Sequence, residues 1–404
     1  MALDWKAERW TPLERQEFDW RALTPHPLSK LDTDAFTRMR VLLMGALENE
    51  QNRFQHLCAR RARALRPALA RVRRVEHHQE TLLRMLRPPD MTHLEEAIAI
   101  EQLAIEQTAA IAQREPDPRL AQAYRVGMLE DFDHLYRFSA LMDRLEGKDA
   151  NNVLQSYTDI RPGRPTIDHH RAPVDDVRDP WDRATVAPLS RLHAVTVVAF
   201  EHLARDFYMI VAPTFADPVA RMLVAEIASV EEQHVTEFGS LFDDTESWLE
   251  QWLVHEAAEV ANYYACAEGE TDARMRDLWT RMLDDELGHL HFVAELFQTV
   301  ERRDALEVVP TPLPAPQAFT EQRAFIRRVL DQERDLRPID DILLTPAEEP
   351  ARAPATVAYR QRVNRAGSPS QAVAAGYRWR PGTELEDEQM ADAMQEELHV
   401  QVQQ

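Results

Sequence analysis

The stretches VEEQH at residues 230–234 and DELGH at residues 285–289 decide the fold that we expect for this chain. Each carries an acidic residue followed three positions later by a histidine, Glu231 with His234 and Glu286 with His289. Residues three apart share one face of an α-helix, so each pair can direct an oxygen and a nitrogen ligand to the same point. Helically spaced apolar residues around both stretches predict that the pairs lie on the buried faces of two helices.

Two further helical segments each place one carboxylate on an apolar stripe. Glu201 lies in AFEHLARDF and Glu256 in WLVHEAAEV, where Glu259 is a rival one turn further along. A buried carboxylate is costly unless it is paired, hydrogen-bonded or bound to a metal. Four carboxylates and two imidazoles from four helices form a donor set that suits iron or manganese.

The helical pattern occurs twice along the chain, and the sequence predicts an all-α protein. Glycine is scarce, at 10 of 404 residues, which argues against glycine-rich phosphate or dinucleotide loops. We expect an irregular N-terminal segment, four helices, a linker, four more helices and a tail, at residues 1–33, 34–146, 147–187, 188–305 and 306–404. The linker and the tail are rich in proline. The tail carries one short helix and an acidic end, and we expect it to be arm-like or partly disordered.

A shift of 155 residues brings polar positions of the two helical runs into register. The matched pairs are Glu76 with Glu231, Glu101 with Glu256, Asp131 with Glu286 and His134 with His289, while Glu48 falls two residues from Glu201. These coincidences favour an internal duplication. The first copy has Gln79 where the second has His234, and glutamine is a poor metal ligand. We interpret the first copy as degenerate, with a metal-free polar network favoured over a metal site there.

The order Glu, Glu-x-x-His, Glu, Glu-x-x-His on four successive helices resembles the ferritin-like di-iron carboxylate proteins. The resemblance covers residues 188–303 in full and 36–146 in eroded form. It implies two tandem ferritin-like four-helix bundles, with two iron ions, or iron and manganese, in the second bundle. It also implies ligand roles: terminal for Glu201 and Glu256, bridging for Glu231 and Glu286, and one metal each for His234 and His289.

The spacing of the four carboxylates departs from the usual pattern of this family. Successive ligands are 30, 25 and 30 residues apart. The middle spacing leaves about 11 residues, or roughly 16 Å of helix, on each side of a tight turn. Ferritin-like bundles usually carry a long crossover at that point, and no such crossover fits here. We expect an up-down-up-down bundle, which can still build the site.

Two other groups of residues have simpler interpretations than a functional one. The linker cluster Asp168-His169-His170 has metal-binding side chains, but a flexible polar linker is the interpretation we favour. Tyr208 and Tyr263 lie about two turns from expected ligands, where core packing is favoured over a redox role.

Charge and composition limit the partners that we expect. The chain carries 69 acidic and 47 basic residues, which makes it a poor candidate for binding nucleic acid or an anionic membrane. Two cysteines and no long apolar run indicate a cytoplasmic protein. Our leading hypothesis is an oxidoreductase that activates dioxygen or peroxide, with a small-molecule substrate and a reductant, and with a homodimer left open. The alternatives are a ferroxidase or metal-binding protein without an organic substrate, and a helical scaffold with a dead site.

Overall fold

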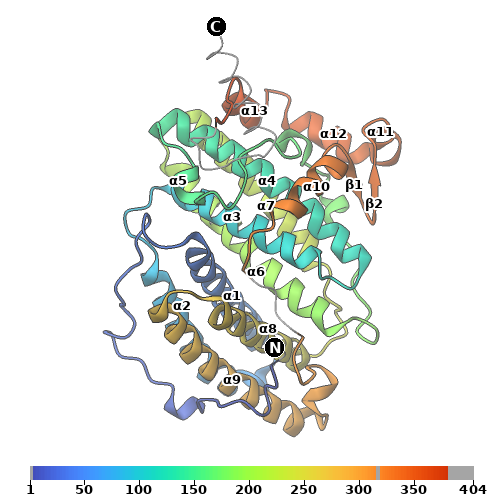
Figure 1. Ribbon diagram of the computed structural model, residues 1–404. Coiled ribbons are helices and arrows are strands. Elements are labelled where there is room, and N and C mark those ends of the chain that lie inside the picture. The colour runs from blue at the N-terminus through green and yellow to red at the C-terminus, as the bar shows by residue number, and fades with distance from the viewer. Residues whose placement is uncertain (1–2, 315–318, 381–404) are drawn as a thin grey trace.

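The computed structural model describes residues 3–314 and 319–380 and confirms the all-α fold class (Figure 1). Its long helices are α1 (Ala35–Arg61), α2 (Arg66–Leu86), α3 (His93–Ala112), α4 (Pro118–Glu146), α6 (Pro188–Val211), α7 (Pro218–Gly239), α8 (Trp248–Gly269) and α9 (Ala273–Glu301). The shorter elements are α5 (Asn151–Leu154), α10 (Arg323–Glu333), α11 (Glu349–Arg352), α12 (Pro354–Val363), α13 (Pro369–Ala374) and an antiparallel pair of strands, β1 (Arg337–Ile339) and β2 (Ile342–Leu344).

Local sequence signals set the ends of several helices. The Asp34 side chain accepts a hydrogen bond of 2.9 Å from the backbone N–H of Phe36 and so caps α1. Thr92 and Glu95 form a reciprocal capping box at the start of α3. Gly147 adopts a left-handed conformation, with φ of 62°, at the end of α4. Asp and Thr are residue types typical of helix starts, and Gly is typical of helix ends.

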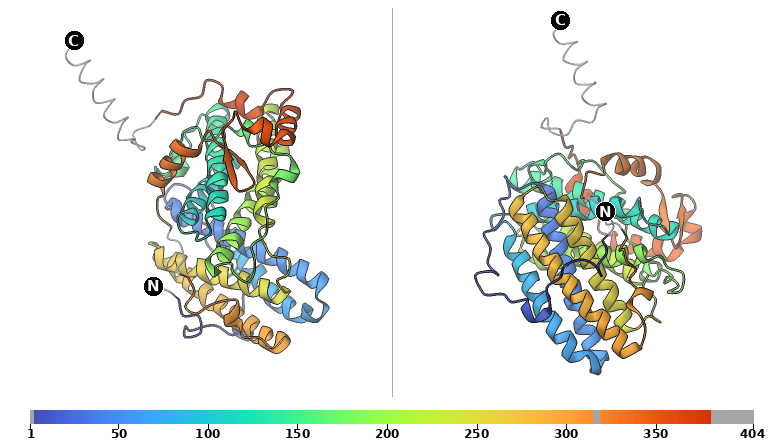
Figure 2. Two further views of the ribbon diagram at one scale, coloured as in Figure 1. Left: turned by 90° about the vertical axis from the view of Figure 1, so that its right-hand side faces the viewer. Right: turned by 60° about the horizontal axis from the view of Figure 1, so that its bottom comes forward.

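The eight long helices form two four-helix units that do not coincide with the two halves of the sequence. Consecutive helices pack as four hairpins, α1–α2, α3–α4, α6–α7 and α8–α9. One unit combines α1, α2, α8 and α9, and the other combines α3, α4, α6 and α7 (Figures 1 and 2). Each unit therefore takes one hairpin from residues 34–146 and one from residues 188–305. This arrangement differs from the two tandem bundles that we expected, because each unit joins helices from both halves of the sequence.

Short connections explain how the chain passes between the units. The connection from α2 to α3 is residues 87–92. A helix parallel to α2 in the same unit would have to start at the far end of α2, about 32 Å away. Six extended residues reach only about 20 Å. A six-residue connection can therefore lead only to an antiparallel helix of the same unit or to a helix of the adjacent unit. In the structure it leads to α3 in the adjacent unit. Residues 240–247 make the equivalent passage from α7 to α8.

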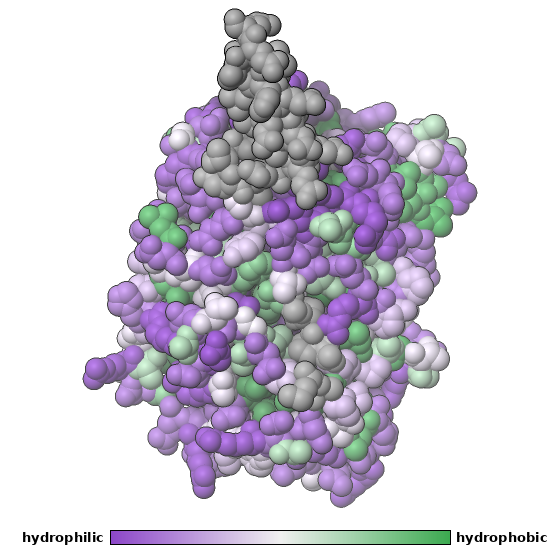
Figure 3. Space-filling view, in the orientation of Figure 1, coloured by the Kyte–Doolittle hydropathy of each residue, from purple (hydrophilic) through white to green (hydrophobic). Residues whose placement is uncertain are grey.

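The helices at the contact between the units are buried on nearly all sides. Almost every residue of α3 is buried, because α3 packs against α1, α4 and α6. By contrast, α2 lies at the outside and buries one stripe. The apolar core continues through both units. The face seen in Figure 3 is largely hydrophilic, with small separate hydrophobic patches.

The linker and the described part of the tail pack against the α3–α4–α6–α7 unit. Linker residues Arg164 and His169 are fully buried, which differs from the flexible polar linker that we expected. In the tail, α13 contacts α4 and α7, so residues 319–380 are not an arm. The acidic stretch 384–397 lies outside the described residues. No helix among the described residues is long and apolar enough to span a membrane.

The carboxylate of Glu226 on α7 holds α13 in place. It accepts hydrogen bonds from the Ser370 backbone N–H at 2.7 Å and the Ser368 hydroxyl at 2.9 Å, and His170 lies 3.4 Å away. Burial raises the pKa of Glu226, but His170 and Ser368 outweigh it, so the net pKa is lowered. A lowered carboxyl pKa contributes stability above the unfolded pKa, and that stability is lost as pH falls through the folded pKa.

We therefore expect Glu226→Gln to reduce the hydrogen-exchange protection of the α13 amides at neutral pH. In the unsubstituted chain the same amides should lose protection as pH falls below the usual range of a glutamate pKa. Hydrogen exchange followed by mass spectrometry measures both effects. Equal protection of α13 in the two proteins at neutral pH would show that Glu226 does not anchor it.

Candidate metal centres

Six acidic and histidine side chains meet inside the α3–α4–α6–α7 unit, and we call this cluster site A. Its members are Glu101 from α3, Asp131 and His134 from α4, Glu201 from α6, and Glu231 and His234 from α7. Each of the six is at most 1% exposed. The cluster therefore lies in the core of the unit, away from bulk water.

The ligand atoms of site A fall into two overlapping groups. Within each group the candidate ligand atoms lie within 4.8 Å of one another. Asp131 and Glu231 belong to both groups. One group adds Glu101 and His134 from the α3–α4 hairpin, and the other adds Glu201 and His234 from the α6–α7 hairpin. Two adjacent cation positions that share two carboxylates would have this arrangement.

A second cluster, site B, lies in the α1–α2–α8–α9 unit. Its members are Glu48 from α1, Glu76 from α2, Glu256 and Glu259 from α8, and Glu286 and His289 from α9. It also divides into two groups, and Glu76 belongs to both. One group contains His289, while the other contains carboxylates alone. Site B thus has one histidine where site A has two.

The structure divides the residues that we expected to form one site. Of the expected ligands, Glu201, Glu231 and His234 lie in site A, and Glu256, Glu286 and His289 lie in site B. The first copy divides in the same way, with Glu101, Asp131 and His134 in site A and Glu48 and Glu76 in site B. The expected grouping by sequence copy is corrected, because exchange of the hairpins changes the partners of each residue. Glu256 and Glu259, which we expected to be alternative ligands, are both members of site B.

Several oxygens of site A have no hydrogen-bond partner in the part of the chain that the structure describes. They are both carboxyl oxygens of Asp131 and the Oε1 atoms of Glu201 and Glu231. Burial, and then the charge of Glu201, raises the pKa of Asp131 well above its usual range. Burial raises the pKa of Glu201 to about 8. Crowded carboxylates in an apolar interior must take up protons or cations, so this cluster is suited to hold positive ions.

Hydrogen bonds fix which nitrogen of His134 faces site A. His169 Nε2 donates to the backbone carbonyl of Arg164 at 2.7 Å, since a carbonyl can only accept. Burial lowers the pKa of His169 and keeps its ring neutral, so its Nδ1 accepts from His134 Nε2–H at 3.2 Å. His134 Nδ1 then faces site A and lies 2.9 Å from Glu231 Oε1. This nitrogen can donate a hydrogen bond to that oxygen or, without its proton, bind a metal ion.

The other two histidines are oriented in the same way. His234 Nε2 lies 3.0 Å from Glu130 Oε2, and His289 Nε2 lies 2.7 Å from Gln16 Oε1. The Gln16 amide nitrogen donates to two backbone carbonyls, so its oxygen accepts from His289. In each ring Nδ1 is left to face its carboxylate cluster. Holding the outer nitrogen through an acceptor is how proteins commonly orient metal-binding histidines.

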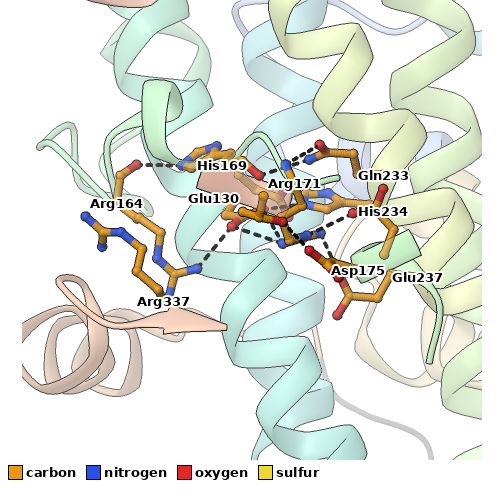
Figure 4. A network of polar contacts seen from close by, with 12 residues as sticks. Glu130, Arg164, His169, Arg171, Asp175, Gln233, His234, Glu237 and Arg337 are labelled. Carbon is orange, nitrogen blue, oxygen red and sulfur yellow. Dashed lines mark hydrogen bonds and ion pairs between the residues drawn. The ribbon is translucent and has the colours of Figure 1, made fainter. Parts of the chain in front are cut away.

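A buried ionic network lies next to site A and contacts its residue His234 (Figure 4). Glu130 Oε1 accepts from Arg164 at 3.0 Å, and Arg171 lies 3.4 Å from the same carboxylate. Arg171 also donates to Glu237 at 2.7 Å. Burial raises the pKa of Glu130, but Arg171 and the other positive and hydrogen-bonding neighbours together outweigh it, so the net pKa falls well below its usual range. Glu130 is thereby kept ionised as an acceptor, and both arginines come from the linker.

The N-terminal segment performs the corresponding role for site B. A Cβ atom at Gly288 on α9 would overlap the Thr11 backbone carbonyl and crowd the Gln16 amide. Glycine at this position therefore allows the N-terminal segment to lie directly against α9. That close approach brings the Gln16 side chain to His289.

The residues around the clusters were not identified from the sequence. Glu130 is adjacent to Asp131 in an acidic run, but its neighbours gave no reason to choose it. His169 belongs to a linker cluster that we noted as a possible metal site, and it contacts His134 instead. Gln16 lies in an irregular segment with no local signal at all.

Comparison with protein families, with curated proteins and with solved structures finds no match for this chain. The chemistry of the two clusters is therefore argued from their own donor atoms. Both combine buried carboxylates with oriented imidazoles, and both contain buried oxygens that lack hydrogen-bond donors. Either cluster could hold metal ions.

We expect His169→Ala to weaken metal binding at site A by about 10-fold to 100-fold, because His134 loses the acceptor that orients it. Chelator competition with Fe2+, without oxygen, measures this affinity. His170→Ala is the matched control, since the neighbouring His170 is also buried but contacts Glu226. Equal affinities in the two variants would exclude this role for His169.

Proposed function

We propose that site A binds two iron ions, or one iron and one manganese, and that the protein is an oxidoreductase acting with dioxygen or peroxide. The observation that carries this proposal is the pair of ligand groups that share Asp131 and Glu231. Site A supplies Glu, Asp-x-x-His, Glu and Glu-x-x-His from four helices, which is similar to the ligand set of ferritin-like di-iron carboxylate proteins.

The side chains of site A suggest distinct roles for its carboxylates. Both oxygens of Asp131 are free of hydrogen bonds, so this residue can bridge two ions together with Glu231. Glu101 would bind one ion. Its Oε1 accepts from the Tyr208 hydroxyl at 2.6 Å, which leaves Oε2 for the metal. Glu201, whose Oε1 has no partner, would bind the other ion.

The depth of site A favours a small oxidant as the molecule that reaches the metals. All six candidate ligands are at most 1% exposed, so a bulky organic molecule does not reach their atoms in this conformation. Dioxygen and peroxide are small enough to enter a packed core. When bound, the metal pair supplies Lewis-acid and redox chemistry towards such an oxidant. The chain holds the ligands in place and keeps water away.

Iron binding and oxygen uptake test the proposal. Protein purified without oxygen should bind about two Fe2+ ions that Asp131→Asn removes. Oxygen uptake that continues with an added reductant supports an oxidoreductase. Uptake that stops when the supplied iron is oxidised indicates a ferroxidase without an organic substrate. Failure to bind iron at site A would overturn the proposal and favour a helical scaffold.

A further inference from the structure

We propose that site B is a second metal centre, richer in oxygen donors than site A and selective for a hard divalent cation such as Mn2+. This inference concerns the α1–α2–α8–α9 unit and is independent of the function proposed for site A. It also replaces our expectation that the first-copy residues Glu48 and Glu76 form a metal-free polar network.

The outer oxygens of site B are held by donors, and the inner oxygens are left free. The Tyr263 hydroxyl donates to Glu48 Oε1 at 2.5 Å. Gln51 and Trp252 donate to Glu256 Oε1 at 2.6 Å and 2.5 Å. The Oε2 atoms of Glu48 and Glu256 have no hydrogen-bond partner. Each carboxylate is thus oriented to present one oxygen as a ligand.

Glu76 in site B corresponds to Glu231 in site A, and like Glu231 it belongs to both ligand groups of its site. Neither oxygen of Glu76 accepts a hydrogen bond from the described residues. Glu259 belongs only to the all-carboxylate group, and neither of its oxygens accepts a hydrogen bond from the described residues. His289 Nδ1 faces the cluster, 3.1 Å from Glu76 Oε1, while Nε2 is held by Gln16. Glu76 Oε2 and both oxygens of Glu259 therefore lie in the core without a hydrogen-bond donor among the described residues.

Charge repulsion within site B also favours cations. Five carboxylates meet around one histidine in this cluster, and each of the five is at most 1% exposed. Carboxylates crowded in an apolar interior must take up protons or cations, and divalent ions can also bind the free oxygens.

The donor set indicates which cation site B prefers. Gln79 stands where a histidine would complete the pattern, and its Nε2 donates to Glu286 Oε1 at 2.5 Å. The Gln79 amide oxygen is buried and has no hydrogen-bond partner. Carboxylate and amide oxygens suit Mn2+, whereas imidazole nitrogen favours later transition metals. Relative to site A, site B should therefore discriminate in favour of Mn2+.

Manganese binding to single-site variants tests the proposal. Calorimetry and Mn2+ electron paramagnetic resonance should show that Glu76→Gln loses about two Mn2+ ions per chain and keeps the iron bound at site A. Asp131→Asn should show the reverse. Glu106→Gln is the control, because Glu106 is a buried carboxylate bonded to Thr158 and Gln322 outside both clusters. Unchanged Mn2+ binding in folded Glu76→Gln would overturn the proposal, even if site A binds iron as expected.

A gain-of-ligand variant provides an independent test. Gln79→His should raise the Co2+ affinity of site B at least about tenfold and change the visible absorption of bound Co2+, because a nitrogen donor is added. Gln107→His places a histidine at another buried glutamine, on α3, and should change neither property. Identical Co2+ affinity and spectra in the two folded variants would exclude a metal position beside Gln79.

Discussion

Replacing Asp131 with alanine should abolish metal binding at site A and leave site B able to bind metal. Asp131 belongs to both ligand groups, and neither of its carboxyl oxygens accepts a hydrogen bond from the described residues. Loss of a shared ligand affects both cation positions at once. Glu201→Ala should affect mainly one position, because Glu201 belongs to one group only. Elemental analysis after loading with Fe2+ under anaerobic conditions should show a loss of about two ions for Asp131→Ala.

The same variant distinguishes exchanged hairpins from tandem bundles. In a tandem arrangement, Asp131 would lie in a different bundle from Glu231 and His234. Its removal would then leave the second-copy ligands intact. Iron that stays bound in Asp131→Ala but is lost in Glu231→Ala would contradict the exchange.

Replacing Arg171 with methionine should lower the free energy of unfolding by about 3–5 kcal/mol. Arg171 is 2% exposed and pairs with Glu130, Asp176 and Glu237, which are also buried. Methionine has a similar length but no charge, so three carboxylates would share less positive charge in the interior. Breaking one side of a buried ionic network is costly because the remaining charges stay desolvated.

Urea unfolding of the metal-free protein measures this loss of stability. Arg205→Met is the control, since Arg205 pairs with Asp206 and Glu232 at the surface. Exposed pairs contribute about 1 kcal/mol or less. Similar losses in both variants would mean that the network around Glu130 contributes little to stability.

The helices and the types of ligand could be predicted from the sequence because they depend on local patterns. Helical periodicity identifies the buried face on which Glu231 and His234 lie, whatever that face packs against. Capping residues such as Asp34 act on the next few backbone groups. Residues such as Gln16 and Arg164 could not be predicted, because their contacts depend on how an irregular segment packs against a distant helix.

The pairing of the hairpins could not be predicted for a different reason. The two halves of the sequence carry similar apolar faces and similar candidate ligands, so a hairpin can pack with a hairpin of its own half or of the other half. The equivalence is visible in the contacts. His134 lies 2.9 Å from Glu231 in site A, and His289 lies 3.1 Å from Glu76 in site B. Both contacts join a fourth-helix histidine of one copy to a second-helix glutamate of the other.

Anomalous diffraction at the iron absorption edge, from crystals loaded with Fe2+ without oxygen, would locate the bound ions directly. We expect two neighbouring peaks in site A, with Asp131 and Glu231 in contact with both ions. His134 and His234 should each contact one ion. Iron bound among Glu201, Glu231, Glu256 and Glu286, or no iron between Asp131 and Glu231, would contradict a centre built from both copies.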